Sequence, residues 1–152
     1  MPDTPPLKLC VVGASGRLGR LILGEAIRRS DFDLVGGVVS HDSVQLGADL
    51  GELAGLPYRG QETRVSLVEA AAGADVVIDV STAKVTPAIA ERLAERGGPA
   101  LVTGVTGLDA AGRAARWKPH SGSRAASRGS TRCATWRGSS RNCRPRAGAH
   151  GG

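Results

Sequence analysis

The last part of this 152-residue sequence stands out for what it lacks. Beyond Leu108 the chain has no Leu, Ile, Val, Met, Phe or Tyr, and residues 111–152 hold ten Lys and Arg but no Asp or Glu. A segment of this composition buries too little apolar surface to offset the entropy lost on ordering it. We therefore expect residues 116–152 to form a disordered, basic tail rich in Arg, Gly and Ser.

Two interpretations of this tail stay open. Its commonest residue types share G- and C-rich codons, which favours out-of-frame translation of a GC-rich gene from about Arg116 onward. The alternative is a genuine basic tail that binds nucleic acid or an anionic surface. The arginines are scattered, and Trp117 and Trp136 are the only aromatic side chains for stacking. Nucleic acid is therefore not the expected partner.

Long apolar runs and cysteine motifs are also missing. The longest apolar stretch near the start, Leu7–Ala14, is interrupted by Lys8 and is too short for a transmembrane helix or a signal peptide. The three cysteines form no CxxC pair, and Cys133 and Cys143 have no His at ligand spacing, so no metal site is expected. These absences favour a cytoplasmic protein without a membrane partner.

Residues 7–115, which follow a short extension over residues 1–6, alternate between predicted strands and helices. Near-continuous apolar strands that alternate with helices are typical of a parallel sheet covered on both faces. The fold class is therefore α/β, with a doubly wound parallel sheet. The predicted strands are Leu7–Val12, Asp33–Val39, Asp75–Asp79 and Ala100–Thr103, and the predicted helices are Arg17–Arg29, Ser66–Ala72 and a third that ends at Arg96.

Capping signals refine these elements. Ser66 is expected to cap its helix, with Glu69 as the second member of a capping box. Pro87 suits the first turn of the last helix, with Thr82 or Thr86 as its cap. Residues 40–64 are rich in Gly and polar side chains, which predicts a loop with one short helical turn around residues 46–53.

A glycine loop joins the first predicted strand to the first predicted helix. Its sequence is Gly13-Ala14-Ser15-Gly16-Arg17-Leu18-Gly19. In this context glycines let the backbone turn and approach a pyrophosphate, while the N–H groups at the start of the helix receive the anion. The sequence therefore predicts a Rossmann-type dinucleotide-binding domain over residues 7–115. The GxxGxxG spacing leaves several reductase and epimerase families open.

The end of the second predicted strand normally selects the cofactor, because an acidic residue there binds the ribose hydroxyls of NAD. The residues at this point are Ser40, His41 and Asp42, so the strand tip itself carries no acid. Ser40 and His41 suit the extra phosphate of NADP, with Arg17 nearby, whereas Asp42 would serve NAD if the loop is offset. The expected cofactor is NADPH or NADH. Ser40 and His41 slightly favour NADPH, or the use of both cofactors.

Four segments together resemble one enzyme family. They are residues 12–20, residues 46–55 (Leu-Gly-Ala-Asp-Leu-Gly-Glu-Leu-Ala-Gly), residues 79–82 and residues 104–107. In this order they resemble 4-hydroxy-tetrahydrodipicolinate reductase, formerly dihydrodipicolinate reductase, an enzyme of lysine biosynthesis. The resemblance covers residues 7–110 and implies an NAD(P)H-dependent oxidoreductase that acts on a small molecule.

The resemblance also implies roles for residues. Residues 13–18 would hold the pyrophosphate, while Gly104, Val105 and Thr106 would approach the nicotinamide, with Val105 standing where the family has Thr. Ser40 and His41 occupy the places of an acidic and a basic residue. The family continues into a substrate domain with a His-His pair and a Lys that this sequence does not show after Ala115. No catalytic residue is therefore assigned.

Three functions follow from these observations. The first is the cofactor-binding part of a reductase, without turnover in this chain. The second is a non-catalytic module that senses NAD(P). The third is a nucleic-acid-binding protein that acts through its tail, with a salt-sensitive affinity.

Overall fold

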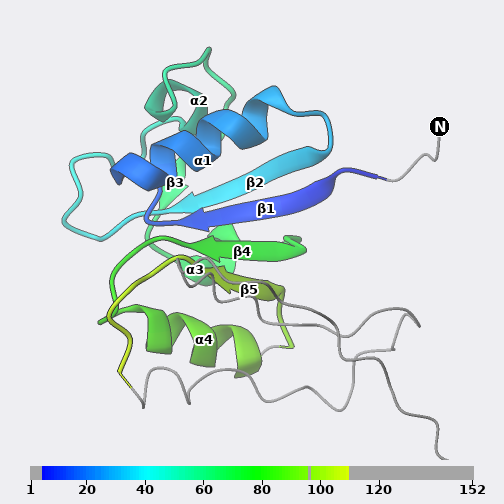
Figure 1. The fold of residues 1–152 in the computed structure, drawn as a ribbon. Helices are drawn as coiled ribbons and strands as arrows, with labels where there is room; N and C mark the ends of the chain where they lie inside the picture. Colours follow the sequence, from blue (N-terminus) through cyan, green and yellow to red (C-terminus); the bar gives the residue numbers. More distant parts are fainter. Residues whose placement is uncertain (1–4, 96, 110–152) are drawn as a thin grey trace, which may run out of the picture.

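The computed structural model describes residues 5–95 and 97–109, which form a five-stranded parallel sheet flanked by helices (Figure 1). The order of the strands across the sheet is β3-β2-β1-β4-β5. The strands are β1 (Leu7–Val12), β2 (Phe32–Val38), β3 (Thr63–Arg64), β4 (Val76–Asp79) and β5 (Ala100–Thr103). The helices are α1 (Arg17–Arg28), α2 (Leu50–Leu53), α3 (Leu67–Ala70) and α4 (Thr86–Glu95). The expectations for residues 116–152 lie outside the described residues.

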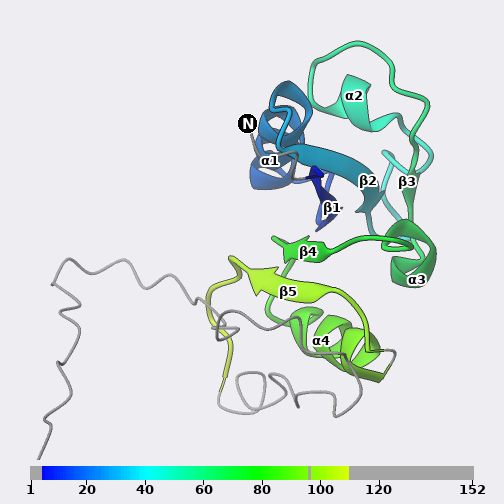
Figure 2. The ribbon, with the colours of Figure 1, turned by 90° about the vertical axis from the view of Figure 1, so that its right-hand side faces the viewer.

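The sheet is doubly wound, as the alternating pattern predicts. Helices α1 and α2 cover one face and α3 and α4 cover the other (Figure 2). Side chains alternate along β1, so that Val11 packs on the α1 side and Cys10 on the α4 side. Two apolar cores therefore hold the sheet between its helices, as burial of both sheet faces requires. The Rossmann-type α/β fold class is confirmed.

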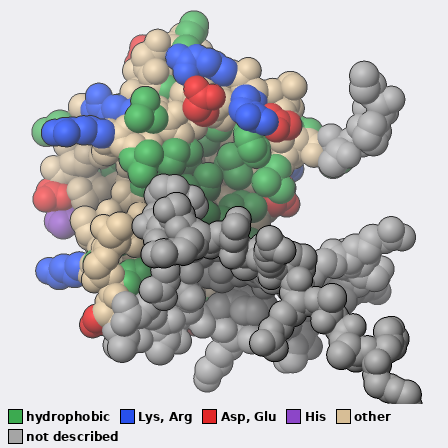
Figure 3. Space-filling model, in the orientation of Figure 1, with side chains coloured by type: hydrophobic (Ala, Val, Ile, Leu, Met, Phe, Trp, Pro, Cys, Tyr) green, Lys and Arg blue, Asp and Glu red, His purple; other side chains and the backbone are tan. Residues whose placement is uncertain are grey.

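Part of the α1 side carries no helix within the described residues. Hydrophobic side chains gather on the surface in view in Figure 3. Leu18 and Leu21 of α1 and Val102 of β5 are among the large hydrophobic residues that remain exposed. Val102 points away from Leu101, which packs in the core beneath α4. The described helices thus cover β1 and β2 on the α1 side but leave β5 open there.

The main difference from the sequence-based expectation lies in residues 40–64. The expected helical turn is present as α2, but Thr63 and Arg64, expected as loop, form β3 at the edge of the sheet beside Gly37 and Val38. A strand of two residues carries no periodicity that a sequence pattern can reveal. Ser66 accepts the N–H of Glu69 at 3.3 Å and caps α3 as expected, whereas the Glu69 carboxylate pairs with Arg64.

Asp49 organises the long connection between β2 and β3. Its buried carboxylate accepts backbone N–H groups from both sides of the loop, namely those of Gly51, Glu52, Arg59, Gly60 and Gln61, at 2.8–3.2 Å. Burial alone would raise the pKa of Asp49, but these hydrogen bonds outweigh it and hold the pKa below its ordinary value. Residues 46–55, one of the four segments that carry the family resemblance, thus have a structural role here.

Replacing this carboxylate should destabilise the fold in a pH-dependent way. We expect Asp49→Asn to lower the free energy of unfolding at pH 7 by about 3 kcal/mol, because hydrogen bonds to a charged acceptor are lost while their donors stay buried. The folded-state pKa lies below the unfolded value of about 3.9, so the carboxylate stabilises the fold above that pH and its contribution is lost as the pH falls through the folded pKa.

Urea unfolding of the wild type and the variant at pH 7 and pH 3 measures this effect. The gap between the two proteins should narrow at pH 3. Asp42→Asn is the matched control, because Asp42 is an exposed carboxylate in the same connection, and we expect a change below about 0.5 kcal/mol. Equal losses in the two variants, or a gap independent of pH, would contradict the assigned role.

Candidate cofactor-binding site

The candidate site lies where the order of the strands reverses. From β1 the chain crosses to β2 on one side and later to β4 on the other, and the glycine loop leaves β1 at this point. Ligands of open α/β sheets bind in the crevice outside the carboxyl ends of the strands at such a switch point. A cavity of about 310 Å³ opens there, lined by Leu18, Val80, Ser81, Thr82, Ala83, Gly104, Val105 and Thr106.

The three glycines of the loop have different surroundings. Gly13 has a φ of +82°, and a side chain on it would lie 2.9 Å from the Val80 carbonyl oxygen. Gly19 is buried, and a side chain there would overlap the Gly13 carbonyl. Gly16 is exposed, and a Cβ on it would have one close neighbour, the Gly13 oxygen at 3.3 Å. Gly13 and Gly19 therefore shape the turn, while Gly16 leaves its outer side open to a ligand.

Within residues 5–95 and 97–109, no side chain caps the start of α1. Gly16 stands at the N-cap, no side chain accepts the first N–H groups, and the first turn holds no acidic residue. In α2 and α3, by contrast, Asp49 and Ser66 accept these groups. Unpaired N–H groups and the positive end of the helix dipole favour an anion at this end of α1. The predicted pyrophosphate cradle therefore has the local chemistry that its ligand needs.

The other loop residues are divided between core and surface. Ala14 is fully buried in the core beneath α1, so only its backbone faces the loop. Ser15 is half-buried, and its carbonyl accepts the Arg20 Nε–H at 3.0 Å. Arg17 is exposed at the start of α1, and Leu18 lines the cavity. Two basic side chains thus flank the uncapped helix end.

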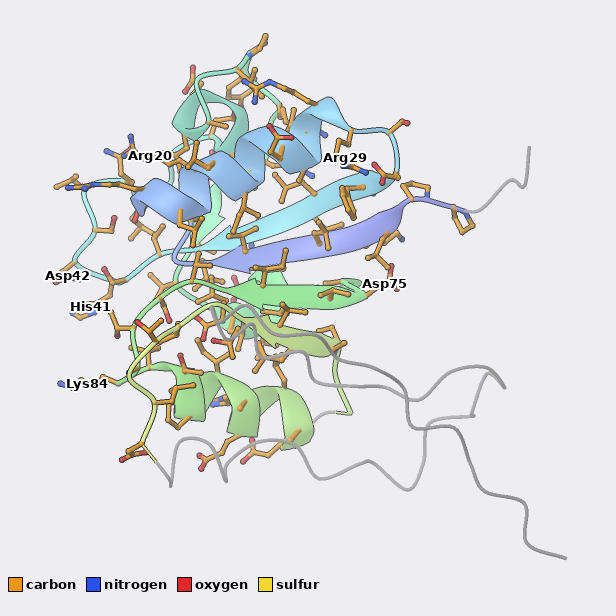
Figure 4. All side chains as sticks on the ribbon, viewed as in Figure 1. Arg20, Arg29, His41, Asp42, Asp75 and Lys84 are labelled. Carbon is orange, nitrogen blue, oxygen red and sulfur yellow. The ribbon has the colours of Figure 1, made fainter. Side chains whose placement is uncertain are left out.

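Ser40, His41 and Asp42 form an exposed turn directly after β2. A hydrogen bond from the Ser40 side chain, followed by a backbone hydrogen bond and the nearby His41, lowers the pKa of Asp42. Figure 4 shows His41 and Asp42 on the side of the molecule that also carries Arg20 and Lys84. The turn that is predicted to select the cofactor therefore lies at the carboxyl edge of the sheet.

The predicted nicotinamide-side residues Gly104, Val105 and Thr106 all line the cavity. Residues 80–83, which follow β4, form another wall of the cavity and were not among the predicted site residues. The available signal was a polar Asp-x-Ser-Thr segment at the end of a buried strand. Because parallel strands end at one edge, such a segment had to border the same crevice.

Other chemistry is limited in the described residues. Cys10 of β1 lies in the core, and burial raises the pKa of its thiol to about 12, so it cannot supply a thiolate near neutral pH. Over residues 5–95 and 97–109, no three His, Cys, Asp or Glu side chains gather to hold a metal ion. None of the helices in this part of the chain is long and apolar enough to cross a membrane. Cys133 and Cys143 lie outside the described residues.

Residues 7–116 match the model of one protein family, described as dihydrodipicolinate reductase, N-terminus. The chain belongs to this family. The 4-hydroxy-tetrahydrodipicolinate reductase of Acinetobacter baumannii (strain AYE) is 38% identical over 101 residues, which are 66% of this chain and 36% of that enzyme. The enzyme of the same name from Alkalilimnicola ehrlichii is 39% identical over 109 residues, 71% of this chain and 40% of the relative. The chain thus spans little more than a third of the length of these family members.

Solved structures of dehydrogenases share the fold. D-galactose-1-dehydrogenase from Rhizobium etli has a TM-score of 0.54 at 17% identity, over 75% of this chain and 33% of that one. The WlbA dehydrogenase from Chromobacterium violaceum, solved with NADH and UDP-GlcNAcA, has a TM-score of 0.51 at 22% identity, over 66% of this chain and 28% of that one. These structural similarities support the Rossmann-type fold. At such low sequence identities they show the fold alone.

Proposed function

We propose that this chain binds NAD(P)H across the carboxyl edge of its sheet, as the cofactor-binding part of a 4-hydroxy-tetrahydrodipicolinate reductase. The observation that carries the proposal is the uncapped start of α1 beside the exposed Gly16. The pyrophosphate fits this position, since the N–H groups there have no other acceptor in the described residues. Family membership supports the same ligand class.

The two ends of the dinucleotide would lie on opposite sides of the glycine loop. The adenosine ribose belongs at the tip of β2, beside Ser40 and His41. The nicotinamide then extends towards β4 and β5, into the cavity between residues 80–83 and 104–106. When bound, the nicotinamide supplies the hydride; the chain's own residues bind and orient it.

Titration of the purified chain with NADH and NADPH, followed by calorimetry, tests this assignment. We expect saturable binding of both cofactors at one site per chain. If neither NADH nor NADPH binds at millimolar concentration, the proposal is overturned. Added inorganic pyrophosphate should compete, because it occupies the same N–H groups at the start of α1.

We further propose that NADPH binds at least as well as NADH. The strand tip offers a hydroxyl and an imidazole, while Asp42 is held by Ser40. We expect Ser40→Asp to lower the affinity for NADPH relative to NADH about tenfold, because a carboxylate repels the 2′-phosphate and accepts hydrogen bonds from the free ribose hydroxyls of NADH.

Val44→Asp is the matched control for this change. Val44 is 93% exposed further along the same connection, so its replacement adds the same charge away from the strand tip. Dissociation constants of both cofactors for the two variants give the result. A ratio of affinities that stays at the wild-type value in Ser40→Asp would show that the ribose lies elsewhere.

The cavity lining also bears on turnover. The eight described residues that line it include no Lys, Arg, His, Asp or Glu. Reduction of a dicarboxylate needs groups that neutralise its charges and a placed proton donor. We propose that these 152 residues bind the cofactor without reducing a substrate. The same observation favours an NAD(P)-sensing module as the second candidate, which would bind the cofactor and a partner protein.

A further inference from the structure

The buried carboxylate at the end of β4 has a place in the site that the cavity lining alone does not reveal. We propose that Asp79 is a positioning residue that joins the two walls of the cofactor crevice and so sets the fit of the nicotinamide end. This inference rests on the proposed cofactor binding. Asp79 has no exposed surface, and it is not among the residues that line the cavity.

The first wall of the cavity, residues 80–83, is hydrogen-bonded to Asp79 through Ser81. The Asp79 Oδ1 atom accepts the backbone N–H of Ser81 at 3.0 Å and its hydroxyl at 2.5 Å. The Oδ2 atom accepts the Thr86 hydroxyl at 2.6 Å, which fixes the start of α4 behind the same turn. Charge-assisted hydrogen bonds of this length are strong, so residues 80–83 are held between β4 and α4.

The second wall, residues 104–106, is hydrogen-bonded to the same residue. The Asp79 backbone carbonyl accepts the Gly104 N–H at 2.9 Å. The Thr103 hydroxyl approaches Oδ2 at 3.5 Å and accepts the Val105 N–H at 3.2 Å, so it links the carboxylate to the next peptide of this wall. One buried residue therefore contacts segments on both sides of the cavity.

The glycine loop abuts the first wall. A side chain on Gly13 would lie 2.9 Å from the Val80 oxygen and 3.0 Å from the Ser81 nitrogen. A shift of the Ser81 turn would therefore alter the gap between the walls next to the pyrophosphate cradle. A buried carboxylate normally needs compensation, and here hydroxyl and amide donors supply it, since none of the ion pairs in the described residues involves Asp79.

The expected signature is a loss confined to one half of the cofactor. The two walls enclose the proposed nicotinamide position. The proposed adenosine ribose and pyrophosphate positions lie instead at the tip of β2 and the start of α1. Weakening the Asp79 network should therefore reduce the affinity for NADH and leave that for ADP-ribose, which lacks the nicotinamide, nearly unchanged. A residue with a merely structural role would weaken both ligands alike.

The experiment compares Asp79→Asn, Thr103→Val and Thr103→Ser in the full chain with NADH and ADP-ribose. We expect Asp79→Asn and Thr103→Val to lower the NADH affinity about tenfold and the ADP-ribose affinity less than twofold. Thr103→Ser keeps the hydroxyl and should bind both ligands as the wild type does. Thr103 is half-buried on an edge strand, where Val is well accommodated, so this pair stays informative if Asp79→Asn does not fold.

Each outcome decides the matter. Equal losses for both ligands, or an unchanged NADH affinity in Thr103→Val, would overturn the positioning role. Failure of Thr103→Ser to retain NADH binding would overturn it as well, because the hydroxyl would then not be the relevant group. A wild type that binds neither ligand would instead refute the proposed function, and this inference with it.

Discussion

Replacing Gly16 with Val should lower the affinity for NADH and NADPH at least about 100-fold while the chain stays folded. Gly16 is exposed, has a φ of −69° that any residue adopts, and meets one close atom, the Gly13 oxygen, where a Cβ would stand. A branched side chain there would occupy the space in front of the first N–H groups of α1. The loss of about two charge-assisted hydrogen bonds to the pyrophosphate accounts for the expected magnitude.

Gly24→Ala is the matched control for this variant. Gly24 lies in the same helix, and the nearest atom to an added Cβ is the flexible Arg28 guanidinium at 3.1 Å. This change should leave cofactor affinity at the wild-type value and raise stability by about 0.5–1 kcal/mol, because Ala favours the helix over Gly. Calorimetric titration with each cofactor and urea unfolding measure both quantities. Wild-type affinity in Gly16→Val would refute the pyrophosphate assignment.

The elements with strong local signals could be predicted from the sequence. The bounds of β1 and β5 agree with the apolar runs that predict them, and α1 ends one residue before its predicted end. These segments have apolar periodicity, and glycine or proline flanks them. The glycine loop was predictable for the same reason, since it combines a sequence pattern with a strand before it and a helix after it.

The contacts that join distant segments could not be predicted. Asp49 accepts N–H groups up to twelve residues away, and Asp79 approaches Thr103 across 24 residues. Thr86 is one of the two residues predicted to cap α4, and its hydroxyl donates to Asp79. Such partners become neighbours only when the sheet is assembled, so a single sequence gives the residue types but not the pairing.

Purified as these 152 residues, the chain should show no reduction of 4-hydroxy-tetrahydrodipicolinate by NADPH. Hydride transfer needs a substrate held in a dry site against the nicotinamide, with its carboxylates neutralised. In the part of the chain that the structure describes, no charged side chain lines the cavity. Residues 116–152 supply arginines but no Leu, Ile, Val, Met or Phe to exclude water.

The assay follows the loss of nicotinamide absorbance with freshly made substrate, and the Acinetobacter baumannii relative serves as the positive control. Turnover above a no-protein control would contradict this expectation. The out-of-frame interpretation of the tail makes a further prediction about the coding DNA.

After codon 115, one of the other two reading frames should encode the His-His pair and the Lys that the family resemblance implies. A protein translated in that frame should gain turnover, whereas Gly16→Val in the same background should abolish it, because the cofactor would no longer bind.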